Sequence, residues 1–338
     1  MSADTMQVIQ QFLLLLQYTL IFSSVLMMVA LGGCFSEHSG VINLGLEGIM
    51  VIGALGGALV MRYLPADASG FVMVLLVMLG AIVFGLVYSA LLGVASINFK
   101  ADQTIVGTAL NMLGVAGATV LVKAINTASN PDNPSSIIEY GLPRQNFLVT
   151  FKIPVSVEGG GAERFLSFEF NWFLVVAVLM LVAAYIVLYK TRFGLRLMAC
   201  GEHPQAAASV GINVLKMRWS GVLISGVYGG LGGICYIMAA VSQWEFERGV
   251  AGFGFLSLAV MIFGQWKPSR IALAALLFGL LRALSNVGTG FAALQALNIP
   301  GGVYNMMPYV ICLVVLAFTS KKSRAPKAEG IPYDKGMR

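Results

Sequence analysis

Charged residues are scarce in this sequence. Asp, Glu, Lys and Arg together make up 11% of the 338 residues, whereas hydrophobic residues make up 58%. A soluble domain usually carries about a quarter charged residues, so this chain has too few charges to cover a globule of its size with a water-compatible surface. The composition predicts an integral membrane protein, with the lipid bilayer as its first partner.

Residue types that carry enzyme chemistry are equally sparse. The chain has two histidines, and its four cysteines are scattered without metal-binding or disulfide spacing. A membrane-embedded enzyme would need His, Asp or Glu clustered at membrane depth, and the sequence offers no such cluster. We therefore predict no catalytic residue, no metal site and no cofactor bound by this chain. The cysteines, interpreted as small core residues, are Cys34, Cys200, Cys235 and Cys312.

Two further signals are missing. The net charge is +6, but no basic patch is interleaved with aromatic residues, which argues against a nucleic-acid partner. The N-terminus lacks the basic region and small-residue cleavage site of a signal peptide, so the first apolar run is expected to be retained as a helix.

What the sequence does contain is a series of long apolar runs. A membrane-spanning helix needs about 20 such residues, and by that measure we predict an all-α polytopic membrane protein with about nine transmembrane helices. Between the fourth and fifth runs, residues 126–169 are rich in turn signals and are expected to form an extramembrane loop with short strands around 147–157. The predicted spans are 12–34, 41–61, 71–97, 103–123, 172–189, 219–241, 252–266, 270–287 and 304–319.

Lysine and arginine indicate the orientation. They gather at Lys100, in the 190–217 loop with Arg218 just beyond it, at Lys267 with Arg270, and in the 320–338 tail. Alternating spans place all four segments on one side, which the positive-inside rule makes cytoplasmic. The N-terminus and the 126–169 loop are then predicted to lie outside. A re-entrant segment around 289–302 would change the number of spans.

Two pairs of segments resemble each other within the chain. Residues 40–46 resemble 249–255, and residues 107–113 resemble 301–307. The first member of each pair would enter the membrane from the cytoplasm and the second from outside, as in an inverted-topology repeat. Chance similarity between glycine-rich stretches is the alternative.

One polar stretch lies at the mouth of the second span. Asn43 and Glu47 are costly in lipid, so they should face protein or a water-filled path, and the glycines around them favour a broken helix. The alternative is that the two side chains, four residues apart, only cap and lock helix packing; for Glu47 this is the favoured interpretation.

A second stretch lies in the 190–217 loop. A proline-led start and small residues predict a short helix within 201–211 on the cytoplasmic surface, suited to docking a soluble partner. A plain connecting loop is the alternative. His203 is expected to be a surface or capping residue rather than a proton carrier. The predicted docking residues are Gly201, Glu202, His203, Pro204, Ala206, Ala207 and Gly211.

These stretches, with 104–108 and 248–264, resemble ABC permeases of the branched-chain amino acid and simple-sugar type. The nearest branch is the nucleoside permeases that work with lipoproteins of the basic membrane protein family. The resemblance covers nearly the whole chain, and SGVINLGLEG together with GEHPQAA and VGIN is fairly specific. Ribose-type relatives have Gly-Ile-Asp-Leu-Ser where this chain has residues 40–44, and they carry an additional leading helix, which we expect this chain not to have.

The resemblance implies a single transmembrane permease domain, 1–338, in the bacterial inner membrane. It implies an importer subunit that forms a path for nucleosides together with a second homologous permease, expected as a heterodimer. A substrate-binding lipoprotein would deliver the solute, and a cytosolic ATPase carrying ATP and Mg would engage the 201–211 segment. No G-x-x-x-x-G-K-[ST] sequence occurs here, so ATP hydrolysis must reside on that other subunit.

Several polar and aromatic side chains are candidates for the path. Amides match ribose hydroxyls or base edges without burying a charge, although each could instead satisfy a helix backbone. Aromatics at a helix mouth could stack on a base or form an interfacial belt. The candidates are Asn43, Glu47, Gln103, Asn111, Trp244, Phe253, Phe255 and Asn305.

Other solutes and another mechanism remain open. Riboflavin or a simple sugar such as ribose or galactose is the alternative cargo. An ion-coupled secondary carrier is the alternative mechanism, but it would need an intramembrane relay of ionisable groups, and only Glu47 and Arg282 qualify.

Overall fold

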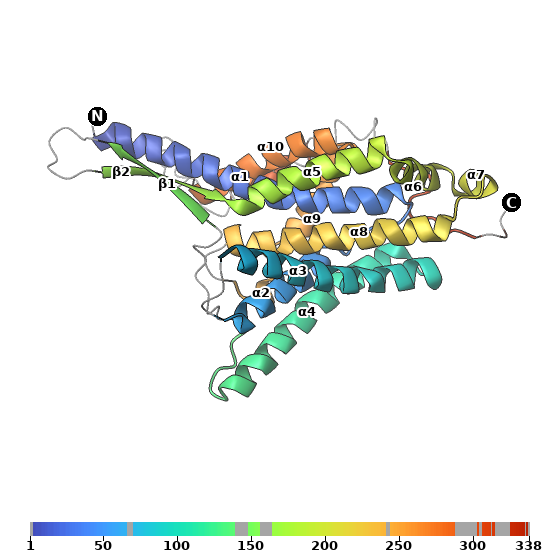
Figure 1. The fold of residues 1–338 in the computed structure, drawn as a ribbon, viewed down its shortest axis with the longest axis horizontal. Helices are drawn as coiled ribbons and strands as arrows, with labels where there is room; N and C mark the ends of the chain where they lie inside the picture. Colours follow the sequence, from blue (N-terminus) through green and yellow to red (C-terminus); the bar gives the residue numbers. More distant parts are fainter. Residues whose placement is uncertain are drawn as a thin grey trace.

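The computed structural model is an elongated bundle of helices with a β-hairpin projecting from one end (Figure 1). It describes residues 3–65, 70–138, 148–155, 164–240, 244–287, 303, 306–311, 313–314, 325–334 and 336. The long helices are α1 (Ala3–His38), α2 (Leu46–Tyr63), α3 (Gly70–Gly93), α4 (Gln103–Ser129), α5 (Trp172–Lys190), α8 (Val214–Cys235) and α10 (Pro268–Val287). The shorter elements are α6 (Arg192–Glu202), α7 (Pro204–Ser209), α9 (Phe253–Phe263), the π-helical turns η1 (Val94–Asn98) and η3 (Tyr236–Ala240), and the 3₁₀ turn η4 (Phe246–Arg248).

Within the described ranges, eight helical segments are long and apolar enough to cross a membrane. They coincide with the first eight predicted spans, so the prediction of a polytopic all-α membrane protein is confirmed. The ninth predicted span, 304–319, lies largely outside the described residues, as does the segment 289–302. Hydropathy locates these helices well because backbone N–H and C=O groups in a bilayer must be satisfied within each segment.

The predicted extramembrane loop contains an antiparallel hairpin. Strand β1 (Leu148–Val155) pairs with β2 (Arg164–Asn171) in the register Leu148↔Asn171 to Val155↔Arg164. The first strand coincides with the predicted one, whereas the second was not predicted. The signal for β2 was present, since three phenylalanines within eight residues favour a strand.

Helix α1 is longer than a bilayer requires, and the hairpin packs on its N-terminal part. Its 36 residues correspond to about 54 Å, against a hydrocarbon thickness of about 30 Å. Gln10 bonds both the backbone N–H (3.1 Å) and C=O (3.0 Å) of Ser167. Gln17 accepts the backbone N–H of Glu169 (3.3 Å) and donates to the carboxylate of the same residue (3.3 Å). The two glutamines thus satisfy a strand edge that would otherwise remain open.

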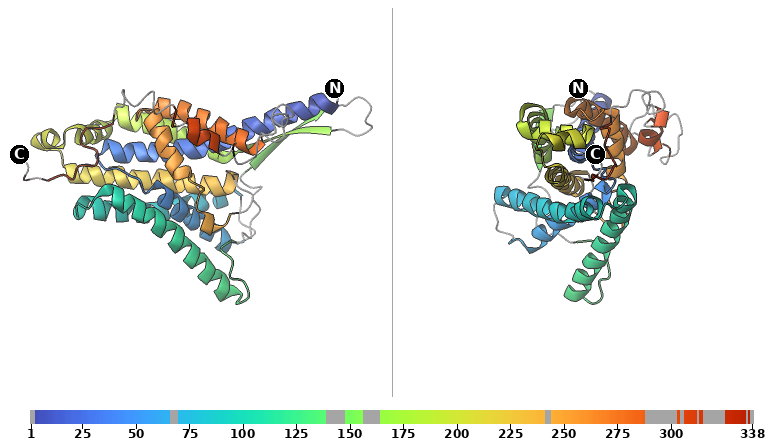
Figure 2. Two further views of the ribbon diagram at one scale, coloured as in Figure 1. Left: turned by 180° about the vertical axis from the view of Figure 1, so that it is seen from behind. Right: turned by 90° about the vertical axis from the view of Figure 1, so that its right-hand side faces the viewer.

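The core is built around α8, which packs on α1, α2 and α3. Glycines allow these backbones to touch. A Cβ on Gly53 of α2 would overlap the Cα of Gly230, and a Cβ on Gly230 would overlap the carbonyl oxygen of Ala81 in α3. Small residues at helix crossings are the usual route to tight packing in membranes, where lipid is as apolar as the side chains. Helix α4, in contrast, diverges from the bundle with one side exposed (Figure 2).

The two ends of the molecule differ in charge. We call the end that carries the hairpin the hairpin end. The opposite end, here called the basic end, contains α6, α7, the turn before α10 and the described tail 325–334 (Figure 1). Lys100 also lies there, since it pairs with Asp334 of the tail. Contacts join these parts, because Lys100 pairs with Asp334, the Ala328 amide donates to Gly201, and Trp266 donates to Glu37 at the end of α1. The four basic segments predicted to share one side therefore do meet, as far as they are described.

Candidate functional site

Two helices, α2 and α9, begin inside the bundle rather than at its ends. Phe253, the first residue of α9, packs on Phe22 near the middle of α1, with ring centroids 5.5 Å apart. Asn43, just before α2, bonds to Ser225 near the middle of α8. The chain reaches both starts through turns in which glycines adopt positive φ, namely Gly40 (90°), Gly249 (54°) and Gly252 (78°), a conformation that glycine adopts without strain.

The two short helices run in opposite directions from their meeting point. Helix α8 is antiparallel to α1, since Gly32 lies against Tyr228 whereas Gly221 lies against Ser39. Helix α2 follows α8 towards the hairpin end, while α9 follows α1 towards the basic end, with Met261 against Gly33. The starts of α2 and α9 are also the segments whose sequences resemble each other. An inverted repeat would produce this arrangement; the other similar pair, 107–113 and 301–307, lies partly outside the described residues.

A single carboxylate joins the two starts. Glu47, in the first turn of α2, accepts the Gly252 amide (2.9 Å) with Oε1 and the Gly254 amide (2.7 Å) with Oε2. Its side chain is buried. The first amides of a helix have no intrahelical acceptor, and they carry partial positive charge that favours an anion. Glu47 therefore caps α9 from another helix, which agrees with the packing interpretation favoured from sequence.

Amide side chains hold the segment that leads into α2. Asn111 on α4 accepts the Gly48 amide (2.8 Å) and donates to the Leu44 carbonyl (2.7 Å). Asn43 accepts the Gly45 amide (3.1 Å), and Gln103 accepts the Ile42 amide (2.7 Å). Each amide satisfies backbone groups freed by the broken helix. In this conformation these side chains fix the junction of α2, and a direct role along the path stays a prediction.

The aromatic candidates separate into buried and exposed. Trp244 donates to the Gly249 carbonyl (2.6 Å) and is buried, and Phe253 lies beneath the Arg282 guanidinium, 5.6 Å from the ring centroid. Phe255 is 49% exposed on the bundle surface. Asn305 lies outside the described residues. Arg282 thus has a cation–π partner, and Glu47 has two amide donors. These contacts give both ionisable groups a structural role and provide no support for an ion relay.

The predicted docking segment forms a helix pair at the basic end. Helix α7 corresponds to the predicted short helix, while α6, capped by the Thr191 hydroxyl accepting from the Gly194 amide (3.2 Å), was not predicted. Gly201, Pro204 and Ala207 face the bundle. The residues that face away from the bundle are Glu202, His203, Gln205, Ala206, Ser209, Val210 and Gly211.

Sequence reasoning missed part of this end. Glu37 was not singled out, although it is buried and accepts from the Trp266 indole (2.5 Å). Arg218 was counted only as a loop charge that sets the orientation, yet it is buried and donates to the Ile331 carbonyl (2.8 Å). The signal available in the sequence was that each of these charged residues lies beside an apolar run. The sequence could not identify their partners, because Trp266 and Ile331 lie far along the chain from Glu37 and Arg218.

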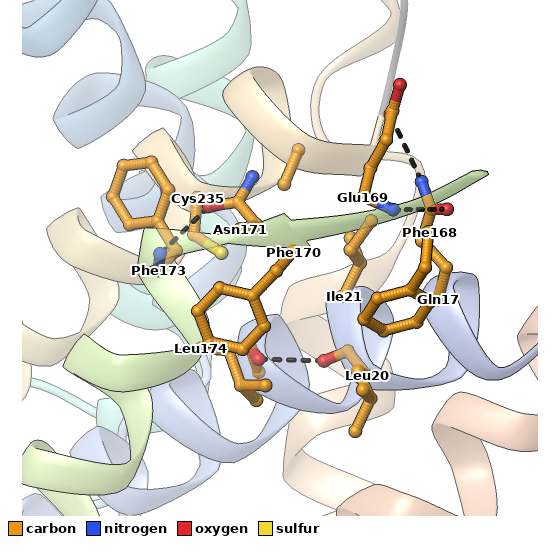
Figure 3. Close-up of a pocket in the computed structure, with 12 residues that line it drawn as sticks. Gln17, Leu20, Ile21, Phe168, Glu169, Phe170, Asn171, Phe173, Leu174 and Cys235 are labelled. Carbon is orange, nitrogen blue, oxygen red and sulfur yellow. Dashed lines mark hydrogen bonds between the residues drawn. The ribbon is translucent and has the colours of Figure 1, made fainter. Parts of the chain in front are cut away.

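A crevice at the hairpin end is too small for a solute. Gln17, Glu169, Asn171 and Cys235 line it where α1 meets the hairpin and α5 (Figure 3). Its cavity volume is about 10 Å³, enough for about one water molecule, whereas pockets for small-molecule ligands usually span about 300–1,000 Å³. The crevice belongs to the packing of the hairpin, and it is not a nucleoside site in this conformation.

Comparison with known proteins identifies the family. The family model described as the permease component of the branched-chain amino acid transport system matches residues 15–317. The nucleoside ABC transporter permease protein NupC of Lactococcus lactis is 38% identical over 98% of this chain and 99% of its own length. The guanosine ABC transporter permease protein NupQ of Bacillus subtilis is 36% identical over 98% and 100%. A putative glucose ABC transporter permease, TsgC13 of Haloferax volcanii, is 30% identical over 90% and 91%.

These matches extend along nearly the whole chain and agree with its helical membrane-spanning architecture. Proteins of this kind are transport components of multi-subunit ABC transporters rather than enzymes. The chain belongs to the family of branched-chain amino acid transport system permease components, and it is a multi-pass ABC transporter permease.

Proposed function

We propose that this chain forms the translocation path of an ATP-driven importer of nucleosides in the bacterial inner membrane. The observation that carries the proposal is its similarity, over almost the full length of both chains, to permeases named for nucleosides and for guanosine. The more distant glucose relative keeps a simple sugar as the second candidate. A second permease would complete the path, and a lipoprotein would deliver the solute at the hairpin end.

Uptake measurements test the solute. The chain would be expressed with its candidate ATPase, lipoprotein and second permease in a host that lacks nucleoside uptake, and labelled guanosine, uridine, ribose, glucose and riboflavin would be compared. We expect nucleoside accumulation that stops when the lysine of the ATPase phosphate-binding loop is replaced. Uptake of a sugar or of riboflavin without nucleoside uptake would refute the nucleoside assignment.

We further propose that the exposed side of α7 docks on the ATPase. Its other side faces the bundle, where Pro204 and Ala207 are buried. The adjoining α6 is fixed to α1, because a Cβ on Gly201 would overlap the His38 carbonyl at the end of α1. A movement of α7 would therefore reach α1 through α6. For the same reason, Gly201→Trp and Pro204→Trp are poor tests of docking, since both residues are buried and the substitutions would disturb the bundle itself.

Ala206→Trp is the sharper test, because Ala206 lies on the exposed side of α7. We expect nucleoside uptake and solute-stimulated ATP hydrolysis to fall at least about tenfold, the equivalent of about 1.4 kcal/mol of lost docking energy, while the amount of folded permease is unchanged. The control is Thr127→Trp, an exposed position near the hairpin end of α4. Equal activity in the two variants would place the ATPase contact elsewhere.

A further inference from the structure

The described tail, residues 325–334, is bound to the basic end of the bundle. The Ala328 amide donates to the Gly201 carbonyl (2.8 Å), the Ile331 carbonyl accepts from Arg218 (2.8 Å), and Asp334 pairs with Lys100 (3.2 Å). The tail therefore touches the end of α6, the start of α8 and the segment before α4.

Apolar contacts strengthen this docking. Tyr333 packs against the small cluster formed by Cys200 of α6, Ala207 of α7 and Val214 of α8. Gly330, with φ of 77°, lies against Ile42 in the segment that leads into α2. One short stretch of chain thus connects the proposed ATPase-docking helices with the broken start of α2.

Arg218 shows that the tail compensates a buried charge. Its side chain is 1% exposed, and its only described hydrogen bond goes to the Ile331 carbonyl; Nε and Nη2 have no partner there. Among the described residues, no ion pair joins Arg218 to a carboxylate. Burying a guanidinium is costly unless it is hydrogen-bonded, so loss of the tail would favour movement of Arg218 towards water.

The central contact of the tail is a pair of carboxyl groups. The Glu329 carboxyl lies within hydrogen-bonding reach of Glu37, which is 3% exposed and also accepts from Trp266. Two ionised carboxylates are acceptors only, so this bond exists only while the pair holds a proton. Burial raises the pKa of Glu329 above its ordinary value.

The surroundings do not replace that proton with a fixed positive charge. Arg218 is directed to the tail backbone, and Lys327 is exposed. The other titratable or polar groups facing this region are Cys34 and His38 from α1, Cys200 and Glu202 from α6, Trp266 before α10, and Tyr333 from the tail.

We propose that residues 325–334 form a proton-dependent latch, which holds α6 and α7 against the 39–45 segment while Glu37 and Glu329 share a proton and releases them when both ionise. Its docking stands on the contacts above, and only its effect on transport rests on the proposed function. The docked tail binds more protons than the free tail, so docking is strongest at low pH and is lost once rising pH removes the last proton of the pair. Release would free α7 to move with the ATPase.

The test measures tail docking directly in the full transporter in lipid nanodiscs. Spin labels at Gln205→Cys and Lys327→Cys, both exposed positions, would report their separation from about pH 5 to pH 9. We expect one short distance at low pH and a broad, longer distribution once the pair has lost its last proton, with the docking constant falling by up to about tenfold per pH unit above that point.

Glu329→Gln in the same labelled protein is the decisive comparison. Its amide can donate to ionised Glu37 without a titrating proton, so we expect the short distance at every pH. A wild-type tail that stays docked throughout, or a Glu329→Gln tail that is released like the wild type, would overturn the latch. Because this readout needs no solute, pH-dependent release without nucleoside uptake would sustain the latch and reject the proposed function.

Discussion

Gly230→Val is expected to prevent this permease from accumulating as a folded membrane protein. Gly230 lies where α8 crosses α2 and α3, with the backbone of Gly53 on one side and that of Ala81 on the other. Overpacking a core usually costs about 1–3 kcal/mol, and the cost should lie at or above that range here because backbone cannot move aside as a side chain can. We expect at least a tenfold loss of folded protein, since about 1.4 kcal/mol already corresponds to a factor of ten.

Gly117→Val is the matched control. Gly117 is also a glycine within a membrane helix, but a Cβ there would meet nothing within 4 Å. Both substitutions carry the same change in intrinsic helix propensity, so only packing distinguishes them. The two variants would be compared by size-exclusion chromatography of a fluorescent fusion and by the temperature at which each aggregates in detergent. Equal yields and equal stabilities would show that the α2–α3–α8 crossing is not the determinant we describe.

Glu47→Ala should produce the second large effect, a loss of both stability and transport. The substitution removes the acceptor of the Gly252 and Gly254 amides, and a buried donor left unsatisfied costs about 1–3 kcal/mol. With two amides affected, we expect a loss of several kcal/mol and separation of the starts of α2 and α9. Nucleoside uptake should become undetectable, even in the protein that still reaches the membrane.

Asp102→Ala is the matched control, because it removes a carboxylate that accepts two helix-start amides at a water-exposed position. The Asp102 carboxylate accepts the Thr104 (2.9 Å) and Ile105 (3.0 Å) amides at the start of α4, but the residue is exposed. Water can replace that acceptor, and loss of an N-cap typically costs about 1 kcal/mol. The thermal stability of the two variants in detergent would be compared, and we expect the larger loss in Glu47→Ala. If Glu47→Ala were no more destabilised than Asp102→Ala, the junction between α2 and α9 would be incidental to the fold.

The basic end of the molecule shows how much of a docking helix can be predicted from its own residues. Pro204 at the first position of α7 and the small residues after it predicted a helix at 201–211, because proline at that position costs no hydrogen bond. The sequence did not show which side of the helix is free. That depends on Tyr333, which packs against the cluster containing Ala207 of α7, and on His38, which lies against Gly201 of the adjoining α6. Both residues are distant along the chain and come close only when α1 and the tail pack.

The junction of α2 and α9 shows the same limit for the membrane interior. The cost of a charge in lipid indicated that Glu47 must face protein or a water-filled path, and its spacing from Asn43 favoured a role in helix packing without naming a partner. Its actual partners are the Gly252 and Gly254 amides, more than 200 residues away. Likewise, Asn111 was a candidate for the path with a helix backbone as its alternative partner, and the structure shows its two polar atoms bonded to Leu44 and Gly48 at the start of α2.

The sequence by itself determined the membrane class, the membrane-spanning helices within the described ranges and the gathering of basic segments at one end. These properties follow from forces that act within each segment, since lipid requires every helix to satisfy its own backbone and lysine and arginine favour one side of the membrane. Only the tertiary structure decided that Glu47 caps α9, that Glu329 reaches Glu37, and that the tail covers Arg218. Each of those partners is selected by how distant helices pack, because a buried polar group takes whatever donor or acceptor the packing brings within reach.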